Sequence, residues 1–302
     1  MNPAAQHRLG LVLVTGSAIA WSTAGYFTRL IALDNWTLLF WRGVFAAIGI
    51  LVFMLATDGR KALGQFAALG APGWLFALVS GAGMVAYITS LTLTTVAHVA
   101  IIYGIVPFVA AGLSWLVIRE KPARMAILAS AVALAGVVVM VGTGAREGSM
   151  LGDFLAFLMT LGMAVMMVIS RRHRAMPILA AACLSAVLSA AVCWPLAQHQ
   201  LPNHGQLAEL ALFGLINSAV GISLFTLGSR MIPAIESALI GSLDAPLAPV
   251  WVWLAFGERP GLNTILGGVL VFGAVLAHVA LGSRSRAAAP VAPLGAAESG
   301  LD

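Results

Sequence analysis

Long apolar segments joined by short polar connections run along almost the whole chain. Charged residues, prolines or glycines bound ten such segments, at residues 8–30, 35–56, 73–91, 96–118, 123–142, 151–169, 177–197, 207–228, 233–256 and 262–282. A transmembrane helix needs about 20 predominantly apolar residues, and segments of this length without strict alternation do not suit barrel strands. The pattern therefore predicts an all-α polytopic membrane protein with ten transmembrane helices.

Composition supports this class. Of the 302 residues 61% are hydrophobic and 9% are charged, whereas soluble domains carry about 25% charged residues. An ordinary soluble fold is excluded, and little of the chain is left for a second, aqueous domain. The last residues, 283–302, are rich in Ala, Pro, Ser and Gly, a composition that predicts a disordered tail.

The distribution of Lys and Arg predicts the orientation. With a cytoplasmic N-terminus, twelve of the 16 basic residues fall on the cytoplasmic side. The outer loops then hold Arg29, Arg146 and Arg259, and Arg42 lies inside the second segment. Because cytoplasmic loops are enriched in basic residues, we expect both termini in the cytoplasm. The membrane that we expect is a bacterial inner (plasma) membrane.

The chain contains an internal repeat. Residues 99–122 read VAIIYGIVPFVAAGLSWLVIREKP and residues 237–260 read SALIGSLDAPLAPVWVWLAFGERP, at a constant offset of 138. Each copy has a proline near its middle and closes on Glu, a basic residue and Pro. The repeat divides the chain into halves of five helices, 1–145 and 146–282. An odd number of spans per half makes the halves inverted, an arrangement common in secondary transporters.

With these features the sequence resembles the drug/metabolite transporter superfamily in its ten-helix EamA-like form. The resemblance covers residues 8 to 282. It rests on the two five-helix halves and on four elements of sequence: Pro107 followed by Glu120, Pro246 followed by Glu258, Phe40-Trp41-Arg42 in the second helix, and Leu243-Asp244-Ala245-Pro246. Among the branches, the chain looks most like the YddG-like amino-acid exporters, a choice supported by Trp21-Ser22-Thr23.

Asp244 is the deepest ionisable residue of the predicted spans. An ionisable side chain inside a membrane is costly and is a candidate functional group. At helical spacing it shares a face with Ser237, Gly241, Ala248 and Trp251. We expect Asp244 to contact the amino group of a substrate or a coupled proton. The alternative is a protonated Asp244 that hydrogen-bonds carbonyl groups freed by the neighbouring prolines.

The offset of 138 pairs Tyr103 with Gly241, so a large side chain faces a small one across the two halves. Pro107 and Pro246 are predicted helix breaks, because proline lacks an N–H group and frees carbonyl groups one turn earlier. Tyr103 either lines the cavity between the halves or packs against a neighbouring helix.

Four further residues are candidate substrate contacts: Trp21, Tyr87, Met163 and Asn217. Methionine surfaces adapt to different apolar ligands, and aromatic rings can hold an amino-acid side chain or an ammonium group. The resemblance implies a cavity among helices one, three, four, six, eight and nine. Packing in the core or against lipid is the alternative for each of these side chains.

Three residues are candidates for gating or proton coupling. His98 and Glu236 occupy equivalent positions at opposite ends of the paired helices, where solvation alone is the alternative. Arg42 lies two turns from the outer end of its helix. It can snorkel to the interface, pair with a carboxylate or hold an anionic part of the substrate.

The sequence predicts a secondary transporter that exports small metabolites, most consistently aromatic or apolar amino acids. Export of other metabolites or drugs is the first alternative. The second is an intramembrane lipid-modifying enzyme that uses Asp244, Glu236 and His98 as acid–base groups. No HExxH or GxxxxGK motif occurs, so we expect no enzyme, cofactor, metal site or nucleic-acid partner. The expected partners are a small-molecule substrate, the lipid bilayer and H⁺ as a candidate coupling ion.

Overall fold

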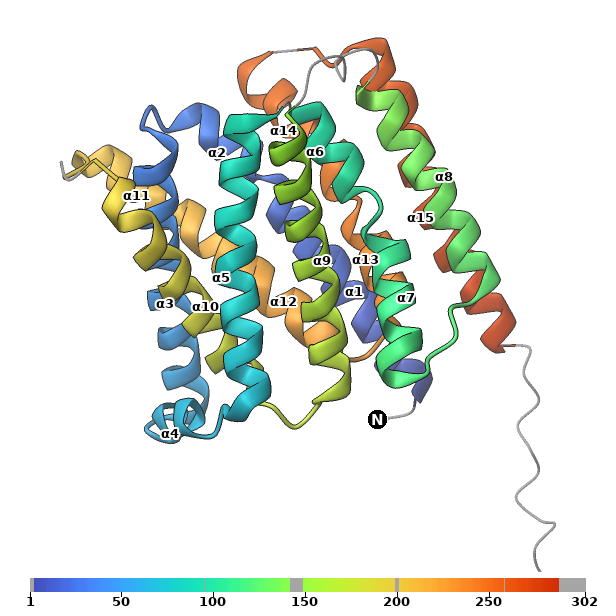
Figure 1. The fold of residues 1–302 in the computed structure, drawn as a ribbon, viewed down its shortest axis with the longest axis horizontal. Helices are drawn as coiled ribbons and strands as arrows, with labels where there is room; N and C mark the ends of the chain where they lie inside the picture. Colours follow the sequence, from blue (N-terminus) through green and yellow to red (C-terminus); the bar gives the residue numbers. More distant parts are fainter. Residues whose placement is uncertain (1–2, 95, 142–148, 199–200, 258, 288–302) are drawn as a thin grey trace, which may run out of the picture.

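The computed structural model describes residues 3–94, 96–141, 149–198, 201–257 and 259–287 (Figure 1). The secondary structure of these residues is helical. Ten helical segments are long and apolar enough to span a membrane, so the prediction of an all-α protein with ten spans is confirmed.

The first half supplies five spans from eight helices in its described part. These are α1 (Pro3–Ser22), α2 (Ala24–Leu30), α3 (Asn35–Asp58), α4 (Lys61–Ala67), α5 (Gly70–Leu93), α6 (Val96–Tyr103), α7 (Val106–Ile118) and α8 (Arg124–Val141). The sequence pattern did not predict the short α4, which connects the second and third spans. Asp34 caps α3, because its carboxylate accepts hydrogen bonds from the N–H groups of Trp36 and Thr37.

The second half follows the same plan with one added irregularity. It comprises α9 (Met150–Arg172), α10 (Ile178–Cys193), a 3₁₀ turn (Trp194–Leu196), α11 (His204–Phe213), the π-helix η3 (Gly214–Val220), α12 (Gly221–Gly228), α13 (Ala234–Gly241), α14 (Asp244–Phe256) and α15 (Leu262–Ala287). The π-helix interrupts the eighth span. Such segments are rare in α-helices and often occur at functional sites.

The fourth and ninth spans are broken at equivalent positions. Residues 104–105 separate α6 from α7, and residues 242–243 separate α13 from α14, so the offset of 138 carries one break onto the other. Pro107 and Pro246 lie in the first turn of α7 and α14. A proline there leaves no hydrogen bond unmade in its own helix, but its ring clashes with the carbonyl group four residues earlier. The clash prevents a continuous helix.

The two halves run in opposite directions through the molecule. Helix α1 begins at the lower end in Figure 1, where the N-terminus lies, and α9 begins at the opposite end. Helix α15 ends at the same end as α1 begins. This arrangement is consistent with the predicted pair of inverted repeats. Helix α15 continues to Ala287 and therefore includes residues 283–287, the first part of the tail that was predicted to be disordered. The rest of that tail, residues 288–302, lies outside the described part of the chain.

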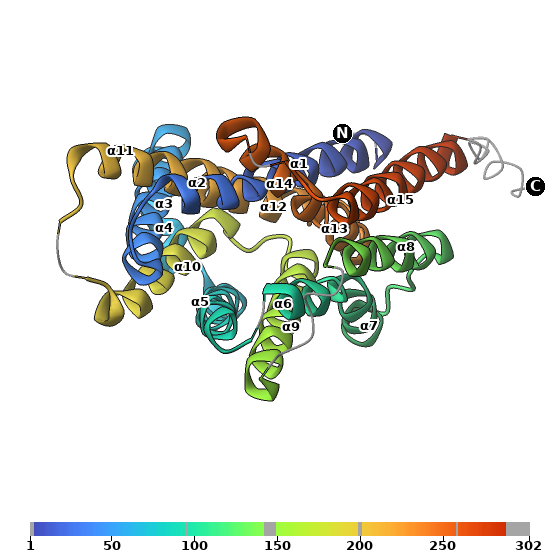
Figure 2. The same ribbon diagram turned by 90° about the horizontal axis from the view of Figure 1, so that it is seen from above.

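Helices from the two halves alternate in the packed core. Seen from above, α6 and α7 lie beside α9, and α13 and α14 lie beside α1 (Figure 2). One buried cluster includes Val14 of α1, Val106 of α7, Ala164 of α9 and Leu239 of α13. The fourth span of each half therefore packs against the first span of the other half.

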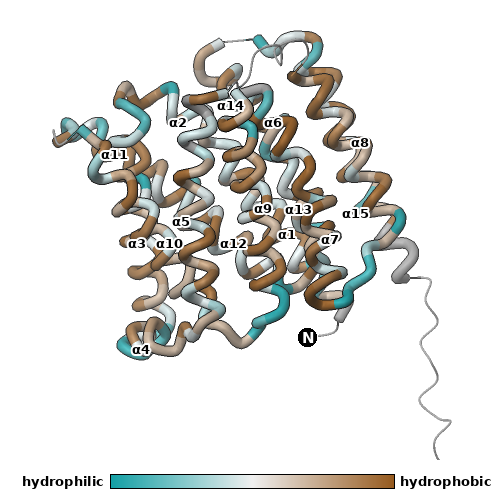
Figure 3. The backbone as a smooth tube through the Cα atoms, viewed as in Figure 1, coloured by the Kyte–Doolittle hydropathy of each residue, from teal (hydrophilic) through white to brown (hydrophobic). Residues whose placement is uncertain are grey.

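The exterior is apolar, as a membrane requires. Hydrophobic residues cover the length of the helices, and hydrophilic residues gather at the turns at both ends (Figure 3). Large aliphatic side chains such as Val52, Leu116, Leu254 and Leu276 are exposed. In water a surface with so many exposed apolar side chains would favour aggregation, whereas in a bilayer these side chains contact lipid.

Candidate functional site

Asp244 is the first residue of α14 and lies directly after the break in the ninth span. Its side chain is partly buried, and no other described side chain forms an ion pair with it. Gly241, at the end of α13, is buried, yet a Cβ atom added there would meet no atom within 4 Å. The break thus places a carboxylate close to an open space inside the bundle.

Two tyrosines of the first half belong to the same region. Tyr103 is the last residue of α6 and packs against the core cluster shared by the two halves. Tyr87 of α5 keeps 38% of its surface exposed. Both phenol groups lie within electrostatic interaction range of Asp244, and Tyr87 is also within range of Arg42. Tyr87 is therefore near both an acid and a base.

Arg42 of α3 is a cation among weak partners. Its Nη1 donates to Oδ1 of Asn217 at 3.4 Å, and its Nη2 lies 3.4 Å from the Met84 sulfur. The guanidinium carbon also lies 5.6 Å from the ring centre of Phe213. The buried Nε has no hydrogen-bond partner. Charge-assisted hydrogen bonds are usually about 2.7–2.9 Å long, so a stronger acceptor could still bind this guanidinium group.

Asn217 of the π-helix connects Arg42 to the first span. Its Nδ2 donates to the carbonyl oxygens of Ala20 and Trp21, at 3.1 and 2.9 Å. The side chain is buried. With the amide nitrogen satisfied by α1, the amide oxygen is left to face Arg42. The π-helix thus positions a polar side chain between two spans.

Two tryptophans lie at the end of the first span, Trp21 within α1 and Trp251 on the neighbouring α14. Trp21 packs against Phe225 with ring centres 4.9 Å apart, and it covers Gly221, where an added Cβ would lie 2.6 Å from the indole nitrogen. Trp251 of α14 donates its indole N–H to the hydroxyl group of Ser22 at 2.8 Å. Each tryptophan therefore has defined packing or hydrogen bonding within the protein.

Ser237 and Met163 lie deeper in the packed region. Ser237 is fully buried and its hydroxyl group has no hydrogen-bond partner. Met163 of α9 is partly buried against the core cluster. The structure thus gathers Arg42, Asn217 and Trp21 into one network and links Tyr87 and Tyr103 electrostatically to Asp244. No side-chain hydrogen bond or ion pair between described residues connects Ser237 or Met163 to these groups.

His98 and Glu236 take part in separate polar clusters. Nδ1 of His98 lies 2.9 and 3.0 Å from the two carboxylate oxygens of Asp153, which also accepts a hydrogen bond of 2.8 Å from Thr94. Glu236 contacts two histidines. Its Oε2 lies 2.8 Å from Nε2 of His7, and its Oε1 lies 3.8 Å from Nε2 of His278.

The sequence reasoning missed His7, Asp153 and His278 as site candidates. Asp153 and His278 lie inside predicted spans, so the rule that an ionisable residue in a membrane is a functional candidate could have found them. His7 lies just before the first predicted span, and no local signal distinguished it. Among the described residues, no group of three or more His, Cys, Asp or Glu could hold a metal ion.

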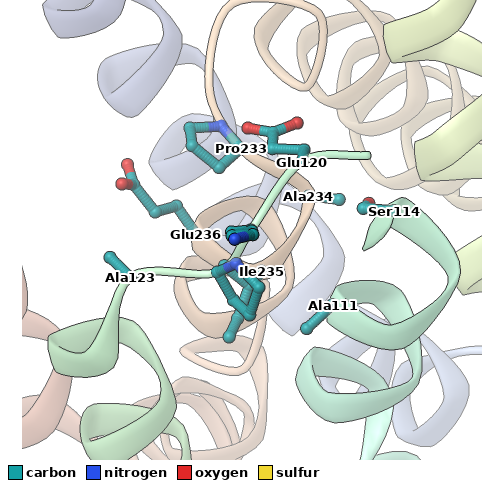
Figure 4. A pocket seen from close by; sticks show the side chains of 10 residues that line it. Ala111, Ser114, Glu120, Ala123, Pro233, Ala234, Ile235 and Glu236 are labelled. Carbon is teal, nitrogen blue, oxygen red and sulfur yellow. The ribbon is translucent and has the colours of Figure 1, made fainter. Parts of the chain in front are cut away.

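A pocket of about 210 Å³ lies next to Glu236 (Figure 4). Ala111 and Ser114 of α7 form one side, and Pro233, Ile235 and Glu236 form another. A second pocket, of about 380 Å³, is lined mainly by apolar side chains of α2, η3 and α14. Neither pocket is lined by Asp244 or Arg42.

Glu120, at the end of the fourth span, pairs with Arg171 of α9. Two of its oxygens lie 2.5 and 2.7 Å from Nε and Nη2 of Arg171, and Nη1 of the same arginine donates to the carbonyl oxygen of Ile232. The pair therefore fixes the end of α7 to α9 and to the α12–α13 connection. Glu258, its counterpart in the repeat, lies outside the described residues.

Comparison with known families gives the functional class. The model of the EamA-like transporter family matches residues 8–142 and 150–279, one copy for each half. The chain belongs to the EamA-like transporter family. This family is part of the drug/metabolite transporter superfamily, so the expected superfamily is confirmed and the alternative of a lipid-modifying enzyme is excluded.

Solved structures agree on the fold of this EamA-like transporter. One chain, described only as a crystal structure of a protein, is 18% identical and has a TM-score of 0.79. The alignment covers 91% of this chain and 98% of the other. No curated protein sequence matches.

Proposed function

We propose that this EamA-like transporter moves zwitterionic amino acids with apolar or aromatic side chains, and that Asp244 and Arg42 bind the two charged groups. The observation that carries the proposal is the pair of unlike charges near Tyr87. Asp244 and Arg42 are both within electrostatic range of its phenol group, and no ion pair joins them to each other. A zwitterion supplies the missing counter-charge to both.

The chemistry of the two side chains suits the two ends of an amino acid. A guanidinium group binds a carboxylate through two parallel hydrogen bonds, and Arg42 has an unpartnered Nε beside weakly bonded terminal nitrogens. A carboxylate such as Asp244 accepts hydrogen bonds from an ammonium group. Inside a membrane protein an unpaired charge is costly, so a ligand that pairs with both residues is favoured.

The surrounding side chains favour an apolar or aromatic substrate. Tyr87, Tyr103 and Trp21 present aromatic surface, and Met163 presents a flexible thioether. Aromatic rings add attraction for rings and for cations, and methionine adapts to different apolar shapes. The same surface gives little stabilisation to a strongly polar substrate.

Transport is proposed to proceed by alternating access between the two inverted halves. Broken spans at the repeat interface are typical of secondary transporters, whose substrates bind near the breaks. A Walker-type nucleotide motif is missing from the sequence, so the driving force in this proposal is a gradient of substrate or of H⁺. With both termini in the cytoplasm of a bacterial cell, as the basic residues favour, the proposed direction is export.

A second candidate is export of apolar drugs. The second pocket opens between Tyr26, Phe27, Ile216 and Trp251 and exposes mostly apolar surface. It lies on the side of α14 that carries Trp251 and is separate from the residues around Asp244. Transport through this pocket would not depend on Arg42.

Counterflow in liposomes tests the proposal. Purified protein is reconstituted, and uptake of labelled phenylalanine is measured against internal phenylalanine, phenethylamine or 3-phenylpropionate. We expect only the zwitterion to exchange efficiently, because each analogue leaves one protein charge unpaired. Equal exchange with all three compounds, or exchange of a neutral apolar drug alone, would contradict the assignment.

Arg42→Gln tests the carboxylate site in the same assay. We expect phenylalanine exchange to fall by about 10- to 150-fold, since a hydrogen bond to a charged group contributes about 1.5–3 kcal/mol. Exchange of phenethylamine, which lacks the carboxylate, should change little. Arg60→Gln is the matched control, because Arg60 is an exposed arginine beside α4.

A further inference from the structure

Two His–carboxylate clusters connect the halves of the molecule at its two ends. At one end, His98 of α6 contacts Asp153 of α9 at 2.9 Å. At the other end, His7 of α1 contacts Glu236 of α13 at 2.8 Å. In Figure 1 the N-terminus marks the second end, and the beginning of α6 lies at the opposite end. Each contact joins the first span of one half to the broken span of the other.

The two contacts occupy equivalent places in the repeat. The offset of 138 carries His98 onto Glu236. Helices α1 and α9 are the first helices of their halves, and His7 and Asp153 both lie near the beginning of these helices. The acid and the base have exchanged positions, because the broken span supplies the histidine in one half and the carboxylate in the other. Both halves therefore contain a His–carboxylate contact between a first span and a broken span.

Each contact holds a half-helix that ends at a break. Helix α6 ends at Tyr103 and α13 ends at Gly241, and the breaks at residues 104–105 and 242–243 follow. Beyond the first break, α7 is held separately by the Glu120–Arg171 pair. Helices α6 and α7 are thus held to α9 by different side-chain contacts.

We propose that His98–Asp153 and His7–Glu236 are the two gates of the transporter, and that each must open for the space near Asp244 to reach its side of the membrane. The proposal rests on the alternating access described above but not on the identity of the substrate. Both pairs are formed in this structure, so it corresponds to a state closed at both ends. Glu236 of the second gate also lines the pocket of about 210 Å³ described above.

The two gates differ in burial. Asp153 and His98 keep 33% and 22% of their side-chain surface exposed, whereas Glu236 and His7 keep 8% and 19%. Separating a buried ion pair leaves poorly solvated charges and costs more than separating an exposed pair. The gate at His98 is therefore the one that opens more readily, and the resting protein should be more accessible from that end.

Side-specific thiol labelling tests the proposal without substrate. In a background with Cys183 and Cys193 replaced by Ala, Gly241→Cys provides a reporter beside the open space. A membrane-impermeant maleimide is applied to intact cells and to inside-out vesicles. We expect Asp153→Asn to raise labelling from one side by about fivefold, the population change that corresponds to about 1 kcal/mol. Glu236→Gln should raise it from the opposite side.

A variant in which the acid and the base of one contact are exchanged distinguishes a gate from a structural contact. The double variant His98→Asp, Asp153→His restores an acid–base contact with the arrangement of the other end, so labelling should return to the level of the reporter background. His204→Ala is the control, because His204 is exposed and lies on α11 away from both contacts. Size-exclusion profiles of each variant establish that it folds.

The outcomes distinguish this proposal from the proposed substrate. Opposite shifts for the two ends support the gates, whichever end faces the outside, even where phenylalanine is not exchanged. Shifts in the same direction, unchanged labelling in both single variants, or an exchanged pair that behaves like Asp153→Asn would overturn it. If the single variants do not fold, the exchanged pair alone decides: normal folding with labelling at the background level supports the gate, and folding with altered labelling contradicts it.

Discussion

The two broken spans have the same backbone and different chemistry. Breaks at residues 104–105 and 242–243 coincide under the repeat offset. At the first break the flanking residues are Tyr103 and Val106, and at the second they are Gly241 and Asp244. One half thus contributes bulk and the other contributes space and a charge. The comparison shows that the two halves share the geometry of the break and differ in the side chains beside it.

The residues that follow the two broken spans provide an all-or-none test of whether these spans cross the membrane in opposite directions. Lys121 follows α7 and Arg259 follows α14. In a chain of inverted halves these positions face opposite sides of the membrane. We expect an impermeant thiol reagent on intact cells to label only one of the variants Lys121→Cys and Arg259→Cys, made without the two native cysteines. Labelling of both from one side would contradict the inverted arrangement.

Asp244 gives the second break an ionisable side chain, whereas Val106 occupies the equivalent position at the first break. Asp244→Asn should reduce phenylalanine exchange in liposomes by about 10- to 150-fold, because an ammonium group loses its charged acceptor, a contribution of about 1.5–3 kcal/mol. Asp58→Asn is the matched control, since Asp58 is exposed and contacts only Gln65 among the hydrogen-bonded side chains described. Wild-type exchange by folded Asp244→Asn protein would remove this residue from the binding site.

Gly241 and Tyr103 differ in size at equivalent positions. Gly241→Leu should lower exchange by about tenfold, or about 1.4 kcal/mol of binding free energy, because the leucine side chain would fill the open space beside Asp244 that the substrate is proposed to occupy. Tyr103→Leu should instead widen the range of amino acids exchanged, with a smaller loss for phenylalanine. Competition by a series of unlabelled amino acids measures both effects. If the two variants changed the series in the same way, the assigned division between bulk and space would be wrong.

The prolines after the two breaks should have the smallest effects. Pro107 and Pro246 lie in the first turn of their helices, where a missing N–H costs little. We expect each Pro→Ala change to lower exchange by less than about fivefold, a factor that corresponds to about 1 kcal/mol. Pro249 lies inside α14, so Pro249→Ala provides a comparison with a proline that is not in the first turn of its helix. A larger loss for Pro107→Ala than for Asp244→Asn would assign the main role to the break itself.

Prediction from sequence succeeded where a signal is local or repeated. Segment length and hydropathy predicted the ten spans, and the offset of 138 predicted that the fourth and ninth spans correspond. The short helix α4 and the π-helix around Asn217 were not predicted. Neither changes the apolar pattern, since a π-helix differs from an α-helix in its hydrogen bonding and not in its composition.

Prediction of the site was less complete because it depends on residues far apart in the chain. Depth in the membrane identified Asp244 and Arg42 as candidates. It did not indicate that Asn217 would lie between Arg42 and the first span, or that Asp153 would contact His98. These contacts join residues separated by 175 and 55 positions, and a single sequence contains no information on which distant side chains meet.

The amino-acid sequence alone determined the class of this protein, the number of its spans and the relation between its halves. These properties follow from the cost of placing polar groups in lipid, which acts on each segment separately and leaves a readable pattern. Tertiary structure decided which charges have partners. His7, His98, Asp153 and Glu236 are joined in pairs while Asp244 and Arg42 are left without ion-pair partners among the described residues, because pairing depends on how spans from opposite halves pack together.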